Sequence, residues 1–333
     1  MASKQTLTST TASEYRKRYG AEMPTLKLAR IMYNETKPLF NSVDHARAIL
    51  RYIEGKMGDK NRKQNPDKSL YVKGERPKNP YSLPPSDETS FEPYKLKAKR
   101  VFLINDVHIP YHSIEAVTAA IDFAKKEKPD CVLLNGDILD FFGLSRFVKD
   151  PRKRHFAEEL KMFKDFFDIL KKQFPKAKIV FKVGNHEERY EHFLWTKASE
   201  LTGVDEFELS NIIKSRAEGI EVIKDKRIIN YNGLNIIHGH EFATSFFSPV
   251  NVARGLFLRG KTSAMQGHSH QTSEHTENDM NGKITTTWSV GALCELHPQF
   301  SPINKWNHGF CMIDAAEDGF EVRNKRIYKG KVL

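Results

Sequence analysis

Cysteine is scarce in this chain of 333 residues, which holds only Cys131, Cys294 and Cys311. These form no CxxC pair, so a disulfide framework and thiolate zinc chemistry are excluded, and a reducing, cytoplasmic location is indicated. No apolar run approaches the roughly 18 residues that a membrane span requires, and the polar start MASKQTLTSTTASEYRK has no signal-peptide core. No GxGxxG or Walker lysine follows a strand, which argues against a nucleotide-cofactor enzyme and a P-loop ATPase.

Positive charge and histidine lie in different parts of the sequence. Residues 1–100 carry 21 Lys and Arg against 11 Asp and Glu, whereas the remaining residues carry 32 against 31. Twelve of the 13 histidines lie in that nearly neutral second part. A basic, histidine-poor segment is typical of a polyanion binder, and a neutral, histidine-rich one is typical of a metal site.

The first 55 residues predict a small basic helical module. Residues 1–20 are polar, and we expect them to be frayed. Helical periodicity begins at Pro24 and ends near Asn34, and a second helix fits residues 42–54, with Asn41 at the N-cap and Gly55 at C′. Residues 56–99 are rich in Lys, Asn, Pro and Ser and predict a flexible basic linker.

Residues 100–333 predict one catalytic domain in which strand–helix alternation gives way to hairpins. Apolar strands are expected at 101–105, 131–135 and 178–183, with helices at 113–126 and 155–174. Asn232-Gly233, Asn281-Gly282 and Asp318-Gly319 are hairpin turns between β-rich runs. The mixture indicates an α+β sandwich of mixed sheets and not a doubly wound Rossmann domain.

Five short polar motifs follow the ends of apolar strands. They are NDVH (105–108), NGDILD (135–140), VGNHEER (183–189), HGH (238–240) and GHSH (267–270). Strand ends are where α/β-type sheets place their sites, and each motif offers Asp, Asn or His. About seven O and N donors could therefore gather in one cleft, which suffices for two metals if one carboxylate bridges them.

The ordered set DxH, GDxxD, GNHE, HGH and GHxH resembles the calcineurin-like metallophosphoesterase superfamily over residues 100–330. The resemblance implies a four-layer α/β/β/α sandwich of two mixed sheets flanked by helices. It also implies that Asp106, His108 and His270 hold a first metal, that Asn185, His238 and His268 hold a second, and that Asp137 bridges them. His186 would be the general acid, and Asp140 would orient its imidazole.

Hard oxygen and nitrogen donors favour two divalent ions, with Mn²⁺ preferred and Fe or Zn²⁺ possible. Two such ions lower the pKa of a shared water and neutralise charge on the phosphoryl oxygens. His240 is left open between a structural role and a place in the site, because only the first His of HGH is a ligand in the family.

Departures from the family pattern bear on the substrate. Protein Ser/Thr phosphatases place Arg-Gly after GDxxD and Arg before GNHE, whereas this chain has Phe141, Phe142 and Val183. These losses argue against a protein phosphatase. We interpret Arg146 and Arg189, which could replace the missing phosphate contact, as solvated surface arginines.

A cluster of cations marks the basic module as a candidate nucleic-acid binder. It consists of Arg47, Arg51, Lys56, Lys60, Arg62 and Lys63. Such a row can neutralise several backbone phosphates; a plain solvated face and an oligomerisation module are the alternatives. The preferred function is a phosphodiesterase or nuclease acting on nucleic acid. The alternatives are a phosphomonoesterase or nucleotide phosphatase, and a non-catalytic nucleic-acid-binding protein with a vestigial site.

Overall fold

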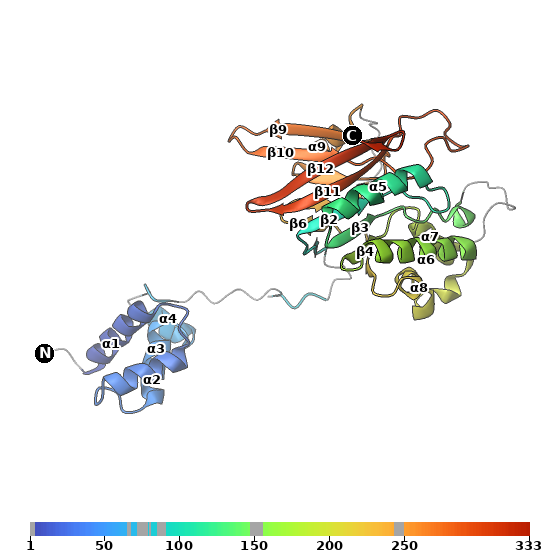
Figure 1. Ribbon diagram of the computed structural model, residues 1–333. Coiled ribbons are helices and arrows are strands. Elements are labelled where there is room, and N and C mark those ends of the chain that lie inside the picture. The colour runs from blue at the N-terminus through green and yellow to red at the C-terminus, as the bar shows by residue number, and fades with distance from the viewer. Residues whose placement is uncertain are drawn as a thin grey trace. The chain divides into compact units, whose positions relative to one another are not determined.

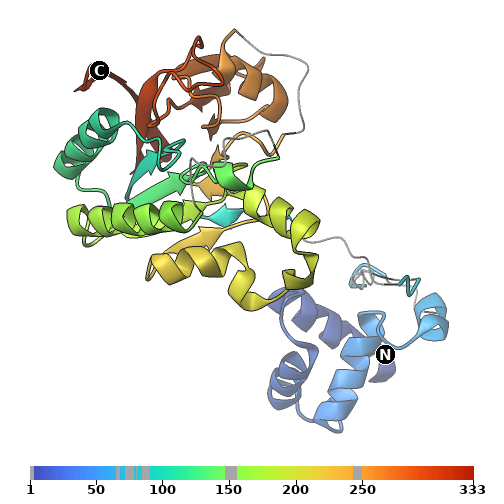
Figure 2. The same cartoon turned by 90° about the vertical axis from the view of Figure 1, so that its right-hand side faces the viewer.

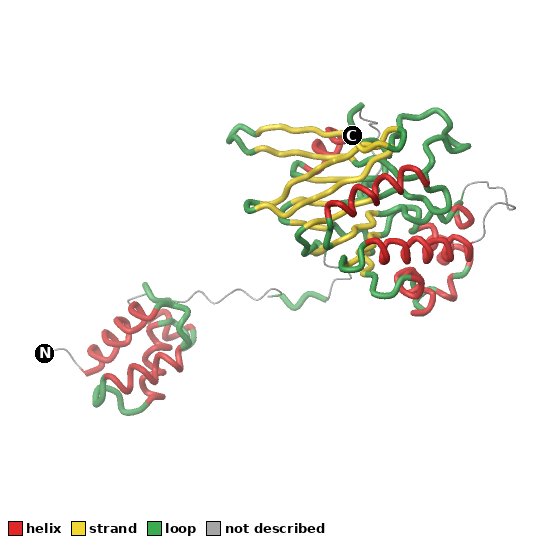
Figure 3. The backbone as a smooth tube through the Cα atoms, in the orientation of Figure 1, coloured by secondary structure: helices red, strands yellow, loops and turns green. Residues whose placement is uncertain are grey.

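The chain folds into two compact units, Met1–Glu88 and Thr89–Leu333. The structure is a computed structural model that describes residues 4–64, 68–71, 79, 81–84, 91–146, 156–242 and 250–333. Figures 1 and 3 show the first unit as a group of helices and the second as sheets with helices against them. Much of the linker predicted over 56–99 lies outside the described residues.

The described part of the N-terminal unit is helical. Its helices are α1 (Lys4–Tyr19), α2 (Thr25–Glu35), α3 (Val43–Ile53) and α4 (Asp59–Gln64). The prediction of a frayed start was wrong, because α1 occupies it, and α4 lies where only a linker was expected. Ala12 of α1 is fully buried with Leu28 and Leu50, so α1 packs on α2 and α3.

A buried ion pair explains why a polar helix belongs to this core. Arg16 pairs with Glu54 although 38 residues separate them, and their side chains are only 4% and 0% exposed. Thr25 Oγ1 also donates to Glu54 Oε2 at 3.0 Å, and Arg16 Nη1 donates to the Met23 carbonyl at 2.7 Å. No local sequence pattern reveals such a contact, so periodicity alone predicted the wrong state for α1.

The cap of α3 also differs from the prediction. Ser42, and not Asn41, is the N-cap, because its Oγ accepts a hydrogen bond from His45 N at 3.0 Å. Gly55 follows the C-cap Glu54 with a φ of +69°, which is the C′ role predicted for it.

The larger sheet of the second unit has parallel strands at one side and antiparallel strands at the other. Its order is β13 (Lys331–Val332), β12 (Gly319–Tyr328), β11 (His308–Ala316), β2 (Arg100–Ile104), β3 (Cys131–Asn135), β4 (Lys178–Lys182) and β5 (Glu221–Ile223). The pairs from β2 to β5 are parallel, and β11 joins β2 antiparallel. This combination confirms the predicted change from strand–helix alternation to hairpins.

The second sheet is also mixed. Its order is β1 (Tyr94–Lys95), β6 (Ile229–Tyr231), β7 (Leu234–Ile236), β8 (Ala264–Gln266), β10 (Ile284–Ser289) and β9 (Ser273–Asn278). Hairpins join β6 to β7 and β9 to β10 at the two predicted Asn-Gly turns. A third hairpin joins β11 to β12 at the predicted Asp-Gly position, with Glu317 and Asp318 in the turn and Gly319 paired with Ala316. At the first of these turns Asn232 and Gly233 have φ of 49° and 95°, which the Asn-Gly pair tolerates.

Side-chain alternation along the strands builds two apolar layers. Phe102 and Ile104 of β2 face the helices, whereas Val101 and Leu103 pack between the sheets. The flanking helices are α5 (Ile114–Glu127), α6 (Phe156–Gln173), α7 (Glu188–Lys197), α8 (Leu209–Arg216) and, against the second sheet, α9 (Val252–Gly260). Figure 2 shows the teal, green and yellow helices on one side of the sheets and orange α9 on the other. The predicted four-layer sandwich is confirmed.

The catalytic unit begins before the predicted boundary at residue 100. Strand β1 pairs with β6, and Leu96 is buried between the sheets. Arg227 Nε donates to the Glu92 carbonyl, although 135 residues separate them. A long-range strand pairing therefore assigns the end of the predicted linker to the sandwich. Among the described helices, none is both long and apolar enough to cross a membrane.

Candidate metal centre

The predicted ligands follow strands that end on the same side of the sandwich. Asp106 and His108 follow β2, Asp137 follows β3, and Asn185 follows β4. The second sheet adds His238 after β7, and His268 and His270 after β8. Parallel strands bring their carboxyl ends to one edge, so these loops converge although they lie far apart in the sequence.

Three donor atoms form one compact triangle. Asp106 Oδ1 lies 3.0 Å from His270 Nε2 and 3.8 Å from His108 Nε2, and the two imidazole nitrogens are 3.3 Å apart. These separations suit donors that share one cation, whose bonds to oxygen and nitrogen are about 2.0–2.2 Å long. All three side chains are buried.

Asp137 lies between that triangle and a second group. Its Oδ2 is 3.1 Å from His238 Nε2 and 4.0 Å from His108 Nε2. Donor atoms of Asp137, His238 and His268 also lie within 4.8 Å of one another. One carboxylate thus faces both groups of imidazoles, which is the position expected of a bridging ligand.

Two buried polar atoms near this carboxylate test whether a metal fits. Within the described residues, Asn185 Oδ1 has no hydrogen-bond partner, and His238 Nε2 makes no well-formed hydrogen bond although it lies 3.1 Å from Asp137 Oδ2. The other ring nitrogen of His238 is engaged, since Nδ1 lies 2.8 Å from the Asn135 carbonyl and donates to it. Buried polar atoms without partners are costly, and a cation would satisfy both. The donor set therefore fits divalent metal ions.

The electrostatics of the site also favour cations. Burial opposes ionisation of Asp106, but the His270 charge and hydrogen bonds from His108 and His270 hold its pKa well below its usual range. Burial opposes protonation of His238, yet the carboxylate of Asp137 raises its pKa to about 10. Each carboxylate attracts positive charge to the imidazole nitrogens that face it.

The backbone at the ligands lies in the left-handed region. Five of the seven predicted ligands have φ between 50° and 63°: Asp106, His108, Asp137, His268 and His270. Such conformations cost free energy in non-glycine residues and concentrate at functional sites. Gly184 allows the loops to approach, because a Cβ there would lie 2.3 Å from Asp137 Oδ1.

The carboxylate of Glu187, which sequence analysis did not single out, fixes two of these loops. Oε1 accepts from the backbone N–H of Ile138 and Leu139 at 2.7 and 2.8 Å. Oε2 accepts from Asp137 and Gly184 at 3.0 and 2.8 Å. Burial and the charge of Asp137 raise the pKa of Glu187 to about 7, but four donors occupy both oxygens, so the structure holds the ionised form. Its position in GNHE was the available signal.

A second buried carboxylate fixes the His238 loop. Glu241 accepts from His238 N at 2.8 Å and Gly239 N at 2.6 Å, and Lys182 Nζ lies 2.9 Å from its Oε1. Lys182 is only 1% exposed and also donates to the Arg227 carbonyl. His240, left open by the sequence, bonds through Nε2 to Glu188 Oε1 at 2.9 Å, which gives it a structural partner.

The predicted general acid and its orienting carboxylate lie together. His186 Nδ1 is 3.3 Å from Asp140 Oδ2 and 3.2 Å from the Asp140 carbonyl. The interpretation of Arg189 as a solvated surface residue was wrong. Its Nη1 donates to the Asp140 carbonyl at 2.8 Å, and its Nη2 lies 2.9 Å from His186 Nε2. His186 lies in the turn that leads into α7, and Arg189 follows three residues later at the start of the helix, which places the guanidinium there.

A sequence model described as "calcineurin-like phosphoesterase" matches residues 99–285, which is more than half of the chain. The chain belongs to this family. It is therefore a metal-dependent phosphoester hydrolase. The family implies a dinuclear site for divalent cations, and the His and Asp side chains described above are able to hold metals.

Similar proteins come from distant sources. The chain is 26% identical over 239 residues to the "Gene 54 protein" of Mycobacterium phage L5, covering 68% of this chain and 92% of that protein. Among solved structures, Vps29 of Entamoeba histolytica in complex with Zn²⁺ is 14% identical, with a TM-score of 0.37. The matched region covers 70% of this chain and 96% of the Vps29 chain. A dimetal phosphatase from Danio rerio is 14% identical, with 70% and 97% coverage and a TM-score of 0.34.

The predicted nucleic-acid contacts belong to the other unit of this phosphoesterase. They lie on or beside α3 and α4, and the exposed ones are Arg47, Arg51, Lys56, Lys60 and Lys63. Lys56 Nζ lies 2.9 Å from Glu54 Oε2, and the Arg62 guanidinium lies 5.2 Å from the centre of the Tyr71 ring.

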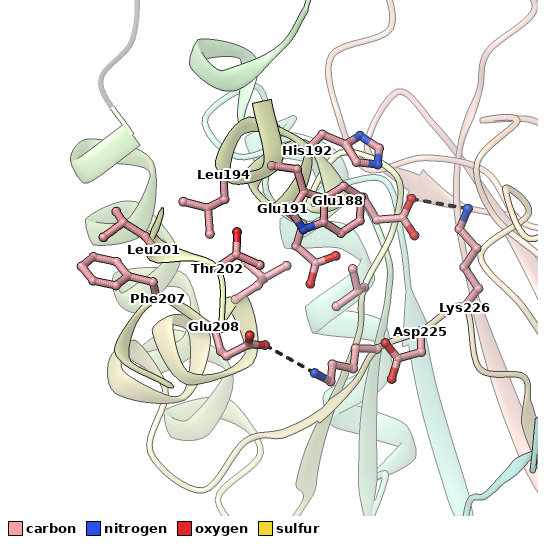
Figure 4. A pocket seen from close by; sticks show the side chains of 14 residues that line it. Glu188, Glu191, His192, Leu194, Leu201, Thr202, Phe207, Glu208, Asp225 and Lys226 are labelled. Carbon is pink, nitrogen blue, oxygen red and sulfur yellow. Dashed lines mark hydrogen bonds and ion pairs between the residues drawn. The ribbon is translucent and has the colours of Figure 1, made fainter. Parts of the chain in front are cut away.

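A separate cavity of about 550 Å³ is lined by side chains of α7 and by the residues that follow β5. Figure 4 shows Glu188 and Glu191 of α7 pointing into it, with Lys226 opposite. Its charges are largely paired, since Lys226 Nζ lies 3.7 Å from Glu188 Oε2 and Lys224 Nζ lies 3.4 Å from Glu208 Oε2. None of the predicted catalytic or metal-binding residues lines it.

The role of Glu187 yields a stability prediction. Glu187→Gln replaces one acceptor oxygen by an NH₂ group that faces two backbone N–H donors, so we expect a loss of about 2–4 kcal/mol of unfolding free energy. Chemical denaturation of the metal-free protein measures it. The matched control is Glu191→Gln, one turn along the same helix, which should change stability by less than about 0.5 kcal/mol. Equal stabilities of the two variants would contradict the role given to Glu187.

Proposed function

We propose that this phosphoesterase is a nuclease or nucleic-acid phosphodiesterase, and that its basic N-terminal unit binds the substrate backbone. The observation that carries the proposal is the compact helical unit, whose exposed cations accompany a nearly neutral phosphoesterase domain. The loss of the two phosphatase arginines agrees with it, because Phe141 is buried and Phe142 begins a 3₁₀ turn. These two positions therefore lack the arginine clamp of the protein phosphatases, and Arg189, beside His186, would supply a single phosphate contact.

The proposed ligand sets follow the two groups of donors. Asp106, His108 and His270 would hold one ion, and Asn185, His238 and His268 would hold the other, with Asp137 shared between them. Oxygen and nitrogen donors without thiolate favour Mn²⁺, with Fe or Zn²⁺ as alternatives. When bound, the two ions would supply Lewis acidity at the phosphoryl group and lower the pKa of a water. The complete donor set argues against a vestigial, purely binding protein.

His186 is the proposed proton donor to the leaving oxygen. An arginine cannot accept a hydrogen bond, so the His186 Nε2 facing Arg189 is the acceptor and Nδ1 carries the proton toward Asp140. An anionic phosphate oxygen would compete with this imidazole for the guanidinium, since charge-assisted hydrogen bonds are stronger. Arg189 would then bind the phosphate, and the freed Nε2 would take up a proton from water. The resulting imidazolium, held through Nδ1 by Asp140, could donate that Nε2 proton to the leaving oxygen.

The shared carboxylate gives the most direct test of the metal centre. Asp137→Asn removes the anion that faces both ligand groups, so turnover should be abolished and metal content should fall below the roughly two ions expected for the parent. Mass spectrometry of the intact protein measures the stoichiometry. The control, Asp122→Asn, changes an exposed carboxylate on α5 and should alter neither. Two retained ions with intact activity in the Asp137 variant would refute the assignment.

Loss of the general acid should be visible only with a poor leaving group. His186→Ala is expected to retain both ions and to slow hydrolysis of an alkyl or nucleotide ester by roughly 10²–10⁴. An activated aryl ester needs little protonation at its leaving oxygen, so it should be affected far less. Rates measured on both substrates decide the matter, and equal losses would assign His186 another role.

Removal of the N-terminal unit tests the proposal that the substrate is a nucleic acid. The truncation is placed after Glu88, because β1 and Leu96 belong to the sandwich. Hydrolysis of bis(p-nitrophenyl) phosphate should be nearly unchanged, whereas duplex binding should weaken. The slope of log affinity against log salt should become shallower by about 0.9 for each phosphate that the shortened protein no longer neutralises, or by about 3.6 for four such phosphates.

A charge-matched pair of variants in the full chain controls for nonspecific attraction. One variant, with Gln at positions 47, 51, 60 and 63 in place of Arg47, Arg51, Lys60 and Lys63, should reproduce the altered slope. The control variant changes four exposed lysines of α6 to Gln: Lys161, Lys164, Lys171 and Lys172. It removes the same charge and should change the salt slope less. An unchanged duplex affinity and slope after truncation would remove nucleic acid as the substrate of choice. A lower sedimentation mass with an unchanged slope would instead assign oligomerisation to the unit.

A further inference from the structure

The loop between β10 and β11 (Figure 1), residues 290–307, makes backbone hydrogen bonds to two of the proposed metal ligands. Leu293 N donates to the Asp106 carbonyl at 3.1 Å, and Asn307 N donates to the His270 carbonyl at 2.8 Å. Ala292 N also donates to the Asn307 carbonyl at 3.0 Å, which closes the base of the loop. The backbone of the loop is therefore held in a fixed position beside the metal centre.

The tip of this loop is ordered by its own hydrogen bonds. Asn304 Nδ2 donates to the carbonyls of Leu296 and Ser301 at 2.6 and 2.8 Å, and its Oδ1 accepts from Trp306 N at 2.9 Å. One asparagine side chain thus joins three parts of the loop. The backbone that carries the exposed side chains is preorganised, so little backbone entropy would be lost when the loop binds a ligand.

Aromatic rings lead from the metal centre to the surface. The ring centres of His270 and Trp306 are 4.1 Å apart, and those of Trp306 and Phe300 are 6.2 Å apart. Phe300 is 77% exposed, and Trp306 is partly exposed. Within the described residues, Phe300 has no aromatic neighbour other than Trp306. An exposed aromatic ring on a fixed loop beside a phosphoester site suits a flat group attached to the phosphate.

We infer that Phe300, whose ring packs edge-on against Trp306 at an interplanar angle of 62°, is a stacking platform for an unpaired nucleobase next to the phosphate at the metal centre. The inference rests on the proposed nuclease function. Aromatic faces bind bases by stacking and tolerate any sequence, because every base has a π-face. Bases inside a duplex are already stacked and paired, so the platform favours single strands and frayed ends. Lys305, which is exposed and precedes Trp306 in the sequence, adds a positive charge that attracts the phosphate backbone of a nucleic acid.

The test compares single-stranded and duplex binding by the full-length protein. Fluorescence anisotropy of a labelled oligothymidine about 12 nucleotides long, within the site sizes usual for single-strand binding, gives the affinity. All variants are made in the metal-loaded His186→Ala background, in which hydrolysis is slow and the metal centre is retained. Phe300→Ala should weaken single-strand binding by roughly 5- to 150-fold, the range measured for removal of one stacking partner. Binding of a blunt duplex of the same length should be nearly unchanged. Phe300→Trp, which keeps an aromatic face, should retain single-strand affinity.

Ile303→Ala is the matched control, because Ile303 is 94% exposed on the same loop but has no aromatic face. It should leave both affinities and diester hydrolysis unchanged. Equal losses for Phe300→Ala on single strand and duplex, or equal effects of both alanine variants, would overturn the platform. If Phe300→Ala instead converted a dimer into a monomer at unchanged affinity, the patch would be a self-association surface. Parent protein that hydrolyses a small diester yet binds neither nucleic acid would refute the nuclease function itself.

Discussion

Four backbone N–H groups converge on the buried carboxylate of Glu187, and the position of Asp137 depends on that convergence. Asp137 follows β3, whereas Gly184 and Glu187 follow β4, so one side chain ties together two loops of the larger sheet. The ligand loops place non-glycine residues in the left-handed region, which they would not adopt alone. Such strain persists only where the surroundings fix it, and Glu187 supplies that constraint from within the centre.

The two sheets contribute differently to the centre. The larger sheet places Asp106, His108 and Asp137 at the ends of adjacent parallel strands, where backbone pairing fixes their spacing. The second sheet contributes imidazoles on loops after β7 and β8, and these loops are held by contacts across the sandwich. Glu241 bonds the His238 and Gly239 amides while pairing with Lys182 of β4. This buried ion pair joins the loop after β7 to β4, and so it fixes the position of His238 relative to the ligands of the larger sheet.

Much of the catalytic unit was predictable because its signals are local. The apolar run of β2, the three hairpin turns and the five strand-end motifs are each short stretches of sequence, and the structure contains all of them. The donor atoms of the motifs converge as strand order requires. The contacts that the sequence did not reveal connect distant segments: Arg16 with Glu54, β1 with β6, and Trp306 with His270. The role of Arg189 was missed although it lies just beyond GNHE, because a motif does not show which way a neighbouring side chain points.

Buried charge is used differently in the two units. In the N-terminal unit, Glu54 is satisfied within the protein by Arg16 and Thr25, so its charge serves the packing of α1 against α2 and α3. In the catalytic unit, buried Asn185 Oδ1 and His238 Nε2 make no well-formed hydrogen bond among the described residues, and a cation held with Asp137 would satisfy both. A buried cluster that is incomplete without a ligand gains free energy when the ligand binds. Metal binding should therefore raise the free energy of unfolding of the sandwich, which thermal denaturation with and without added metal would measure.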